Sequence, residues 1–228
     1  MKGKFIVIEG TDGTGKETQT NLVVKELRVK GLKVKVMDFP QYEKTFFGKL
    51  VGRFLKGEFG NLKEVNPYLA ALTFAGDRWQ AKDEINSYLK KNYFVVSNRY
   101  VLSNMAHQSS KLPKEKRLQL IKFLEELEYK IYGIPKEDIN ILLTLPVDIG
   151  QKLIEKKKPR SYLGNKKKKD IQEDNLDYQM ETSKMFEVLA KQYKNIEKIN
   201  CCKDNKLMSI EEIHDIIWKK LRYRLNLE

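Results

Sequence analysis

Short apolar runs alternate with longer, mostly polar stretches along the chain. Runs typical of strands occur at residues 5–8, 32–38, 94–96, 139–145 and 196–199, and the alternation with lysines at 32–38 indicates one face in contact with water. Between them, apolar residues recur three and four positions apart, the spacing of helices with one buried face. Five strands alternating with helices predict a doubly wound α/β fold: a five-stranded parallel sheet flanked by helices, in one domain over residues 1–228.

Glycines and capping residues place the ends of several predicted helices. One helix starts near Lys16 and ends at Gly31, which tolerates the left-handed backbone conformation. Asn66 followed by Pro67 starts another, which is expected to run to about Tyr88.

The remaining helices are expected at residues 47–54, 113–132 and 170–193. Asp148 can cap a further helix, and Ser209 opens a capping box for the last one. The predicted core stripes include Leu69, Trp79 and Ile131.

The first strand runs into a glycine-rich turn that predicts a triphosphate site. Gly10, Gly15 and Lys16 have the spacing G-x-x-x-x-G-K, so backbone N–H groups can surround a phosphate while the lysine reaches its outer oxygens. Gly13 and Gly15 permit positive φ, and the helix that follows directs its partial positive charge at the anion. The alternative is a strand-to-helix turn that binds nothing. The expected ATP-binding residues are Gly10, Thr11, Asp12, Gly13, Thr14, Gly15, Lys16, Glu17 and Thr18.

One position departs from this motif. Glu17 stands where a serine or threonine is expected to ligate Mg²⁺, and Thr18 follows it. Thr18 lies about 100° further round the helix and cannot simply replace that ligand. The way in which magnesium is held therefore stays open.

The composition narrows the classes of partner and compartment. The net charge of +13 suits anionic ligands, either nucleotides or nucleic acid, although lysines are spread along the whole chain. The two cysteines, Cys201 and Cys202, are adjacent and poorly placed for a disulfide or a metal site. Without an 18-residue apolar run or a signal-peptide pattern, we expect a cytoplasmic protein that does not enter membranes.

Candidate binding residues follow the ends of predicted strands. Phe39 comes after the second strand and Arg99 after the third, where side chains line the ligand crevice of a parallel sheet. Arg99 could clamp phosphates with two parallel hydrogen bonds. His107, on the next helix, fits a packing or surface role better than that of a general base, which phosphoryl transfer does not need.

Two other features allow more than one interpretation. Phe74 and Arg78 lie four residues apart on one helix face, and the residues alone favour a core aromatic beside a surface arginine. Residues 152–169 are rich in lysine around Pro159 and can form a solvated loop, a lid over the transferring phosphate, or a nucleic-acid contact.

Several stretches together resemble the thymidylate kinase family of P-loop nucleoside-monophosphate kinases. GTDGTGKETQ is similar to the family's phosphate loop, DFPQY to its F-P signature, and LTFAGDRW to its F-x-x-x-R-W segment. SNRYVLSNMAHQ is similar to D-R-[YH]-x-x-S-x-x-A-x-Q, and DNLDYQMETSKMFEVLA lines up with the family's post-lid helix. The likeness spans residues 4 to about 193. It implies a P-loop kinase architecture with a mobile basic lid at about residues 156–170, and it moves Phe74 and Arg78 to the substrate site.

The resemblance implies transfer of the γ-phosphoryl group of ATP to dTMP, with Mg²⁺ as cofactor. Lys16 and the loop amides would hold the ATP phosphates, Asp12 would accept from the deoxyribose 3′-hydroxyl, and Arg99 would bridge the two nucleotides. Phe74 would stack on thymine and Arg78 would donate to a base carbonyl. The residues implied to bind substrate are Asp12, Phe39, Phe74, Arg78, Arg99, Ser103, Gln108 and Tyr178. A homodimer is also implied.

Departures from the family pattern leave two other functions open. Besides Glu17, Asn98 replaces the acid that usually precedes the arginine, and Gln41 and Tyr42 stand where relatives often carry a phosphate-binding arginine. The alternatives are a kinase of another nucleotide or nucleoside, and a P-loop ATPase that binds nucleic acid. Steeply salt-dependent oligonucleotide binding would distinguish the ATPase.

The lid is expected to supply the catalytic cation. Some relatives carry an arginine directly after the loop acid, where this chain has Gly13, so the resemblance assigns the role to Arg160 or a nearby lysine. Replacing Arg160 with alanine should lower kcat by much more than about tenfold, because the negative charge of the transition state loses the cation that stabilises it. ATP binding should stay nearly unchanged. Steady-state kinetics and ATP titration measure the two quantities, and an unaltered kcat would reject the assignment.

Overall fold

The computed structural model describes residues 2–155, 170–172, 175–204 and 206–227. The predicted lid lies outside these residues except for Asp170, and so does Arg160.

A five-stranded parallel sheet forms the centre of the molecule, as predicted. Its strands are β1 (Lys4–Gly10), β2 (Val34–Asp38), β3 (Phe94–Asn98), β4 (Ile139–Thr144) and β5 (Ile196–Asn200). Their order is β2-β3-β1-β4-β5, so β1 is central and pairs with β3 and β4. The carboxyl ends of β1 and β3 are therefore adjacent, which brings the glycine-rich turn beside Arg99.

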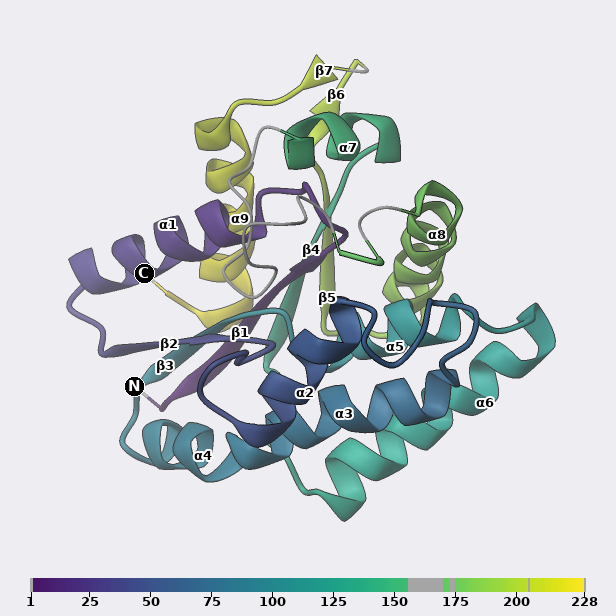
Figure 1. Ribbon diagram of the computed structural model, residues 1–228. Helices are drawn as coiled ribbons and strands as arrows, with labels where there is room; N and C mark the ends of the chain where they lie inside the picture. Colours follow the sequence, from purple (N-terminus) through teal and green to yellow (C-terminus); the bar gives the residue numbers. More distant parts are fainter. Residues whose placement is uncertain (1, 156–169, 173–174, 205, 228) are drawn as a thin grey trace.

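Helices cover both faces of the sheet (Figure 1). On one face, α1 (Lys16–Val29) and α9 (Ile210–Leu225) bury aliphatic side chains against Ile6 and Ile8. On the other, α5 (Val101–Ser109) and α8 (Leu176–Gln192) lie next to the strands, and α3 (Pro67–Gln80) and α6 (Lys114–Glu125) pack against α5; their buried side chains form one core with Phe5 and Val7. Because successive β1 side chains alternate between the two faces, this strand is buried on both sides.

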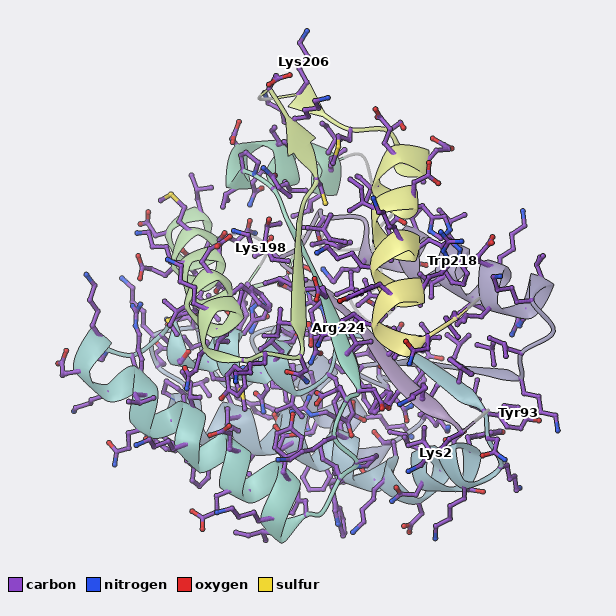
Figure 2. All side chains as sticks on the ribbon, turned by 180° about the vertical axis from the view of Figure 1, so that it is seen from behind. Lys2, Tyr93, Lys198, Lys206, Trp218 and Arg224 are labelled. Atoms are coloured by element: carbon purple, nitrogen blue, oxygen red, sulfur yellow. The ribbon has the colours of Figure 1, made fainter. Side chains whose placement is uncertain are left out.

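Two ion pairs join the last helix, α9, to β5 at the edge of the five-stranded sheet. Lys220 and Arg224 of α9 both bind the carboxylate of Glu197 in β5, at 2.7 and 2.8 Å. Figure 2 shows α9 from behind the view of Figure 1, with Trp218 and Arg224 along it.

Shorter elements complete the fold. They are α2 (Phe46–Leu55), α4 (Lys82–Lys90), α7 (Val147–Glu155), a π-helical turn η1 (Glu126–Ile131), and a small hairpin of β6 (Cys202–Lys203) and β7 (Lys206–Leu207). Sequence patterns did not predict the hairpin, because strands of two residues carry no periodicity. Among the described helices, none has the length and hydropathy that a membrane span requires.

Several predicted helix ends are confirmed. The Asn66 side chain accepts from the N–H of Tyr68 with Pro67 in the first turn, and Ser209 and Glu212 form the capping box. Gly31 has φ of 76° just after α1.

Other helix predictions were wrong in extent. The helix from Pro67 breaks at Ala81, where a separate helix, α4, begins. The predicted helix over 113–132 changes to π-helical geometry at Glu126, and the one over 170–193 begins only at Leu176, capped by Asn175. Asp148 is the second residue of α7 and not its cap. Apolar periodicity therefore located these helices but not their exact ends.

Three residues predicted to be in the core are exposed instead. Leu69, Trp79 and Ile131 keep 63%, 47% and 69% of their surface in solvent. The apolar pattern located their helices correctly, but it did not distinguish a core face from an apolar outer face.

Candidate active site

The glycine-rich turn after β1 has the backbone geometry predicted for it. Gly10, Gly13 and Gly15 have φ of 145°, 85° and 79°, and Gly15 is the N-cap of α1. The buried Lys16 ammonium donates to the carbonyl of Thr11 at 2.6 Å, so its long side chain folds back over the loop. The loop therefore combines a cation, a helix N-terminus and a glycine-lined cradle, as an anion site requires.

Gly13 is also constrained by α7. A Cβ at this position would lie 2.4 Å from the carbonyl oxygen of Gly150, well inside van der Waals contact. An arginine here, as some relatives carry, would require both a strained backbone and a shift of α7. The structure thus gives a steric reason for glycine at position 13.

Arg99 joins the loop to helix α5. It follows β3 with φ of 63°, outside the regular strand region, and its side chain turns toward the loop. Nη2 donates to Asp12 Oδ1 at 2.6 Å, and Nη1 donates to Ser103 Oγ at 3.0 Å. The guanidinium is thereby fixed above the shared edge of β1 and β3.

Glu9 is a site residue that sequence reasoning missed. Its carboxylate is fully buried and accepts from the backbone N–H groups of Tyr100 and Ser103 and from the Ser103 hydroxyl. These are N–H groups at the start of α5, which have no partner within the helix. Sequence reasoning overlooked Glu9 because it considered only the apolar residues 5–8 of this strand. A charged residue at the end of a fully buried strand is nevertheless a signal of function.

His107 connects Arg99 with Tyr178. Its Nε2 lies 3.2 Å from Arg99 Nη1 and its Nδ1 lies 2.8 Å from the Tyr178 hydroxyl. Because a guanidinium only donates, Nε2 must accept, so the proton resides on Nδ1 and is donated to Tyr178. The Tyr178 hydroxyl in turn donates to the His107 carbonyl at 3.2 Å.

Burial, together with the positive charge of Arg99, holds the pKa of His107 well below 6.5. A neutral imidazole fits the tautomer that the contacts require. The predicted packing role for His107 is thus refined, since the ring is a hydrogen-bonded spacer beside Arg99.

A pocket that is partly open to solvent lies next to Arg99. Its wall contains most of the residues that the resemblance implied for substrate: Asp12, Phe39, Phe74, Arg78, Arg99, Ser103 and Gln108. Tyr178 is not in the wall but reaches it through His107. The pocket is also lined by Tyr42, which was named only as a departure from the family pattern, and by Tyr100, Asn104, Asp170 and Gln172, to which sequence reasoning gave no substrate role.

Arg78 is buried and held rigidly, so the interpretation as a surface arginine was wrong. Nε and Nη2 donate to the two carboxylate oxygens of Glu128 at 2.5 and 2.7 Å, and only 3% of the Arg78 side chain is exposed. Asn104 Nδ2 donates to the same carboxylate at 3.0 Å and to the Ala71 carbonyl at 3.1 Å. Glu128 therefore fixes both residues at the pocket wall.

Phe74 is half-buried at the pocket wall, with the ring of Phe54 edge-on to it at 6.1 Å between centroids. An aromatic ring held in this way by its neighbour can offer a face for stacking.

Several polar atoms of the wall have no hydrogen-bond partner among the residues that the structure describes. They are the Tyr100 hydroxyl, Asn104 Oδ1, Gln108 Nε2 and Gln172 Nε2. Buried polar groups are normally paired, so such a cluster is typical of a site completed by a polar ligand.

The positions that depart from the family pattern are placed as follows. Glu17 and Thr18 are exposed on α1. Asn98 donates to Asp38 at 2.8 Å, so a carboxylate still lies beside this position. Within residues 2–155, 170–172, 175–204 and 206–227, no three His, Cys, Asp or Glu side chains gather as a metal site would require.

Comparison with known proteins gives one consistent result. The model of the thymidylate kinase family matches residues 8–215. A probable thymidylate kinase of Pyrococcus abyssi is 30% identical over 228 residues, covering 99% of this chain and 98% of the relative. The thymidylate kinase of Plasmodium falciparum is 40% identical over 111 residues, which is 49% of this chain and 50% of that relative. The solved thymidylate kinase of Candida albicans has the same fold, with a TM-score of 0.75, 21% identity and coverage of 100% and 94%.

The depressed pKa of His107 predicts a loss of stability in acid. The unfolded chain takes up a proton on this residue below about pH 6.5, whereas the folded chain does not, so the free energy of unfolding falls as pH decreases. His107→Asn should remove about 1 kcal/mol of the decrease between pH 7.5 and 5.5, as measured by urea unfolding. The other histidine, the partly exposed His214, is the matched control, because His214→Asn should change this decrease less. If His107→Asn keeps the full acid decrease, His107 is protonated in the folded protein.

Proposed function

Because this chain belongs to the thymidylate kinase family, we propose that it transfers the γ-phosphoryl group of ATP to dTMP, giving dTDP and ADP. The observation that carries the choice of acceptor is the set of hydrogen-bonding atoms in the pocket wall.

Asn104 and Gln108 offer an acceptor and a donor in fixed orientations. Both hydrogen-bonded contacts of Asn104 Nδ2 are to protein oxygens, which leaves Oδ1 to accept from a ligand. Gln108 Oε1 accepts from Lys111 at 2.8 Å, which leaves Nε2 to donate. The imide edge of thymine has an N–H between two carbonyls and can satisfy both, whereas the corresponding ring nitrogen of cytosine is an acceptor. Arg78 supplies a further donor for a base carbonyl, and Phe74 stacks on the ring.

The phosphate groups meet above the edge shared by β1 and β3. Lys16 and the amides of residues 10–18 bind the ATP phosphates, and Arg99 lies between this loop and the pocket, where it bridges donor and acceptor. Asp12 accepts from the 3′-hydroxyl of the sugar, and Tyr178 supports the pocket wall through His107. Ser103 holds Arg99 in place.

The chemistry requires positioning and charge neutralisation more than proton transfer. A phosphate oxygen of dTMP attacks the γ-phosphorus, the bond from that phosphorus to the β–γ bridging oxygen breaks, and ADP leaves with the electron pair. The attacking oxygen is already ionised at neutral pH, so no protein base is needed, which agrees with a neutral His107. Arg160 remains the proposed lid cation.

Magnesium would supply further charge neutralisation at the ATP phosphates. The described residues provide no cluster of three ligands, and Glu17 is exposed at the start of α1. This arrangement fits an ion bound mainly by phosphate oxygens and water, with Glu17 contacting it through water.

We also propose that two copies of the chain associate through an exposed apolar face. Phe46, Trp79 and Ile131 come from α2, α3 and η1 and are at least 47% exposed. These residues lie close together, because Gln80 accepts from the N–H of Phe47 and the Trp79 ring packs on Tyr132 at 5.8 Å. A symmetric pairing would bury this surface on both copies.

A panel of monophosphates tests the acceptor. With ATP and Mg²⁺, ADP release should be fastest with dTMP, about tenfold lower in kcat/KM with dUMP, which lacks the methyl group, and at least about 100-fold lower with dCMP. Asn104→Ala should reduce kcat/KM for dTMP by about 10- to 100-fold, mostly through KM, whereas Asn86→Ala on α4 should leave it unchanged. Equal rates with dCMP and dTMP would contradict the proposal.

Sedimentation velocity tests the dimer. Trp79→Glu places a charge in the proposed interface and should shift the protein to monomer at micromolar concentration. Tyr223→Glu, at an 84% exposed position of α9, is the control and should have the same association state as the wild type. A wild-type protein that sediments as a monomer would refute the interface.

A further inference from the structure

Lys111 lies just beyond α5 and directs its ammonium back at the pocket wall. Its Nζ donates to Gln108 Oε1 at 2.8 Å. The same nitrogen lies over the rings of Phe54 and Tyr178, at 4.8 and 5.8 Å from their centroids. Lys111 itself is absent from the pocket wall, so its effect on a ligand must pass through Gln108.

The surroundings of this lysine are unusual for a cation. Among the described residues no carboxylate forms an ion pair with it, and its hydrogen bond is to a neutral amide. Two aromatic faces supply the remaining stabilisation, since ring quadrupoles attract cations. Burial lowers the pKa of Lys111 to about 7.

The amide oxygen of Gln108 is hydrogen-bonded, whereas its amide nitrogen has no partner among the described residues. The side chain is fully buried, and the oxygen, Oε1, accepts from Lys111. An ammonium has three donors and no acceptor, so it permits only the amide orientation in which Oε1 points to Lys111. An uncharged amine can also accept, and would then allow the opposite orientation.

We propose that Lys111 is a positioning residue that sets the base preference of the enzyme, because its ammonium holds the Gln108 amide with the NH₂ group toward a base carbonyl. This inference rests on the proposed function, since it names what fixes one of the two reading groups of that site. A carbonyl of thymine accepts from this NH₂ group, whereas the amino group of cytosine would meet donor against donor.

The other ionisable groups of this wall are common to the wild type and to every variant at position 111, and Tyr178 lies behind them; those in the wall are Asp12, Tyr42, Arg78, Arg99, Tyr100, His107 and Asp170. Burial holds the pKa of His107 well below 6.5 and raises that of Tyr178 well above 10. A comparison of variants therefore isolates the charge of Lys111.

Thymidine is the probe for the test, because it carries no phosphate that titrates near neutral pH. Its dissociation constant is measured by calorimetry at about pH 6 and pH 8.5 for the wild type, Lys111→Arg and Lys111→Met. The wild type should bind about tenfold more weakly at the higher pH, as a charged hydrogen bond becomes a neutral one. Lys111→Arg should bind tightly at both values, and Lys111→Met weakly at both.

Lys116→Met, on the exposed side of α6, is the matched control and should reproduce the wild-type profile. Removing a partly buried charge should leave the urea midpoint of Lys111→Met at least as high as that of the wild type, which separates the effect from unfolding. Lys111→Met binding thymidine with wild-type affinity and pH dependence would overturn the inference. Failure of the wild type to phosphorylate dTMP would instead refute the proposed function, whereas a wild type that phosphorylates dTMP but does not bind thymidine would overturn the inference alone.

Discussion

The site depends on one buried carboxylate, Glu9 at the end of the central strand. It accepts from the first backbone N–H groups of α5 and from the Ser103 hydroxyl, so it fixes this helix against β1. Ser103 and His107 of the same helix then hold Arg99, which also binds Asp12 in the phosphate loop. A charge removed from water is stable only with such a full set of donors, and those donors belong to the elements that form the pocket.

The same principle applies at the far side of the pocket. Glu128 neutralises Arg78 and also fixes Asn104, so one acidic residue on a π-helical turn orients two groups of the wall. Removing one partner of such a buried pair is costly, because the other charge remains without compensation. Buried charge networks thus set the positions of these groups in the pocket wall.

The sequence predicted the parts of this structure that depend on local patterns. Five strands, their parallel arrangement and the glycine-rich loop followed from periodicity and from residue spacing, and the sheet and backbone angles agree. The roles of Glu9, Asn104 and Lys111 could not be predicted in this way, because each depends on contacts between segments distant in sequence or on burial. Trp79 illustrates the same limit: it lies at the helical spacing of the apolar residues of α3, yet its side chain is exposed.

The contact between Gly13 and Gly150 links the phosphate loop to α7 without any side chain between them. A Cβ at position 13 would lie 2.4 Å from the Gly150 carbonyl oxygen, so a larger residue there requires α7 to move, whereas a Cβ at Gly150 would lie 3.1 Å from the Asp12 carbonyl oxygen and needs a smaller shift. A descendant of this chain could therefore acquire an arginine in the loop only together with a displacement of α7.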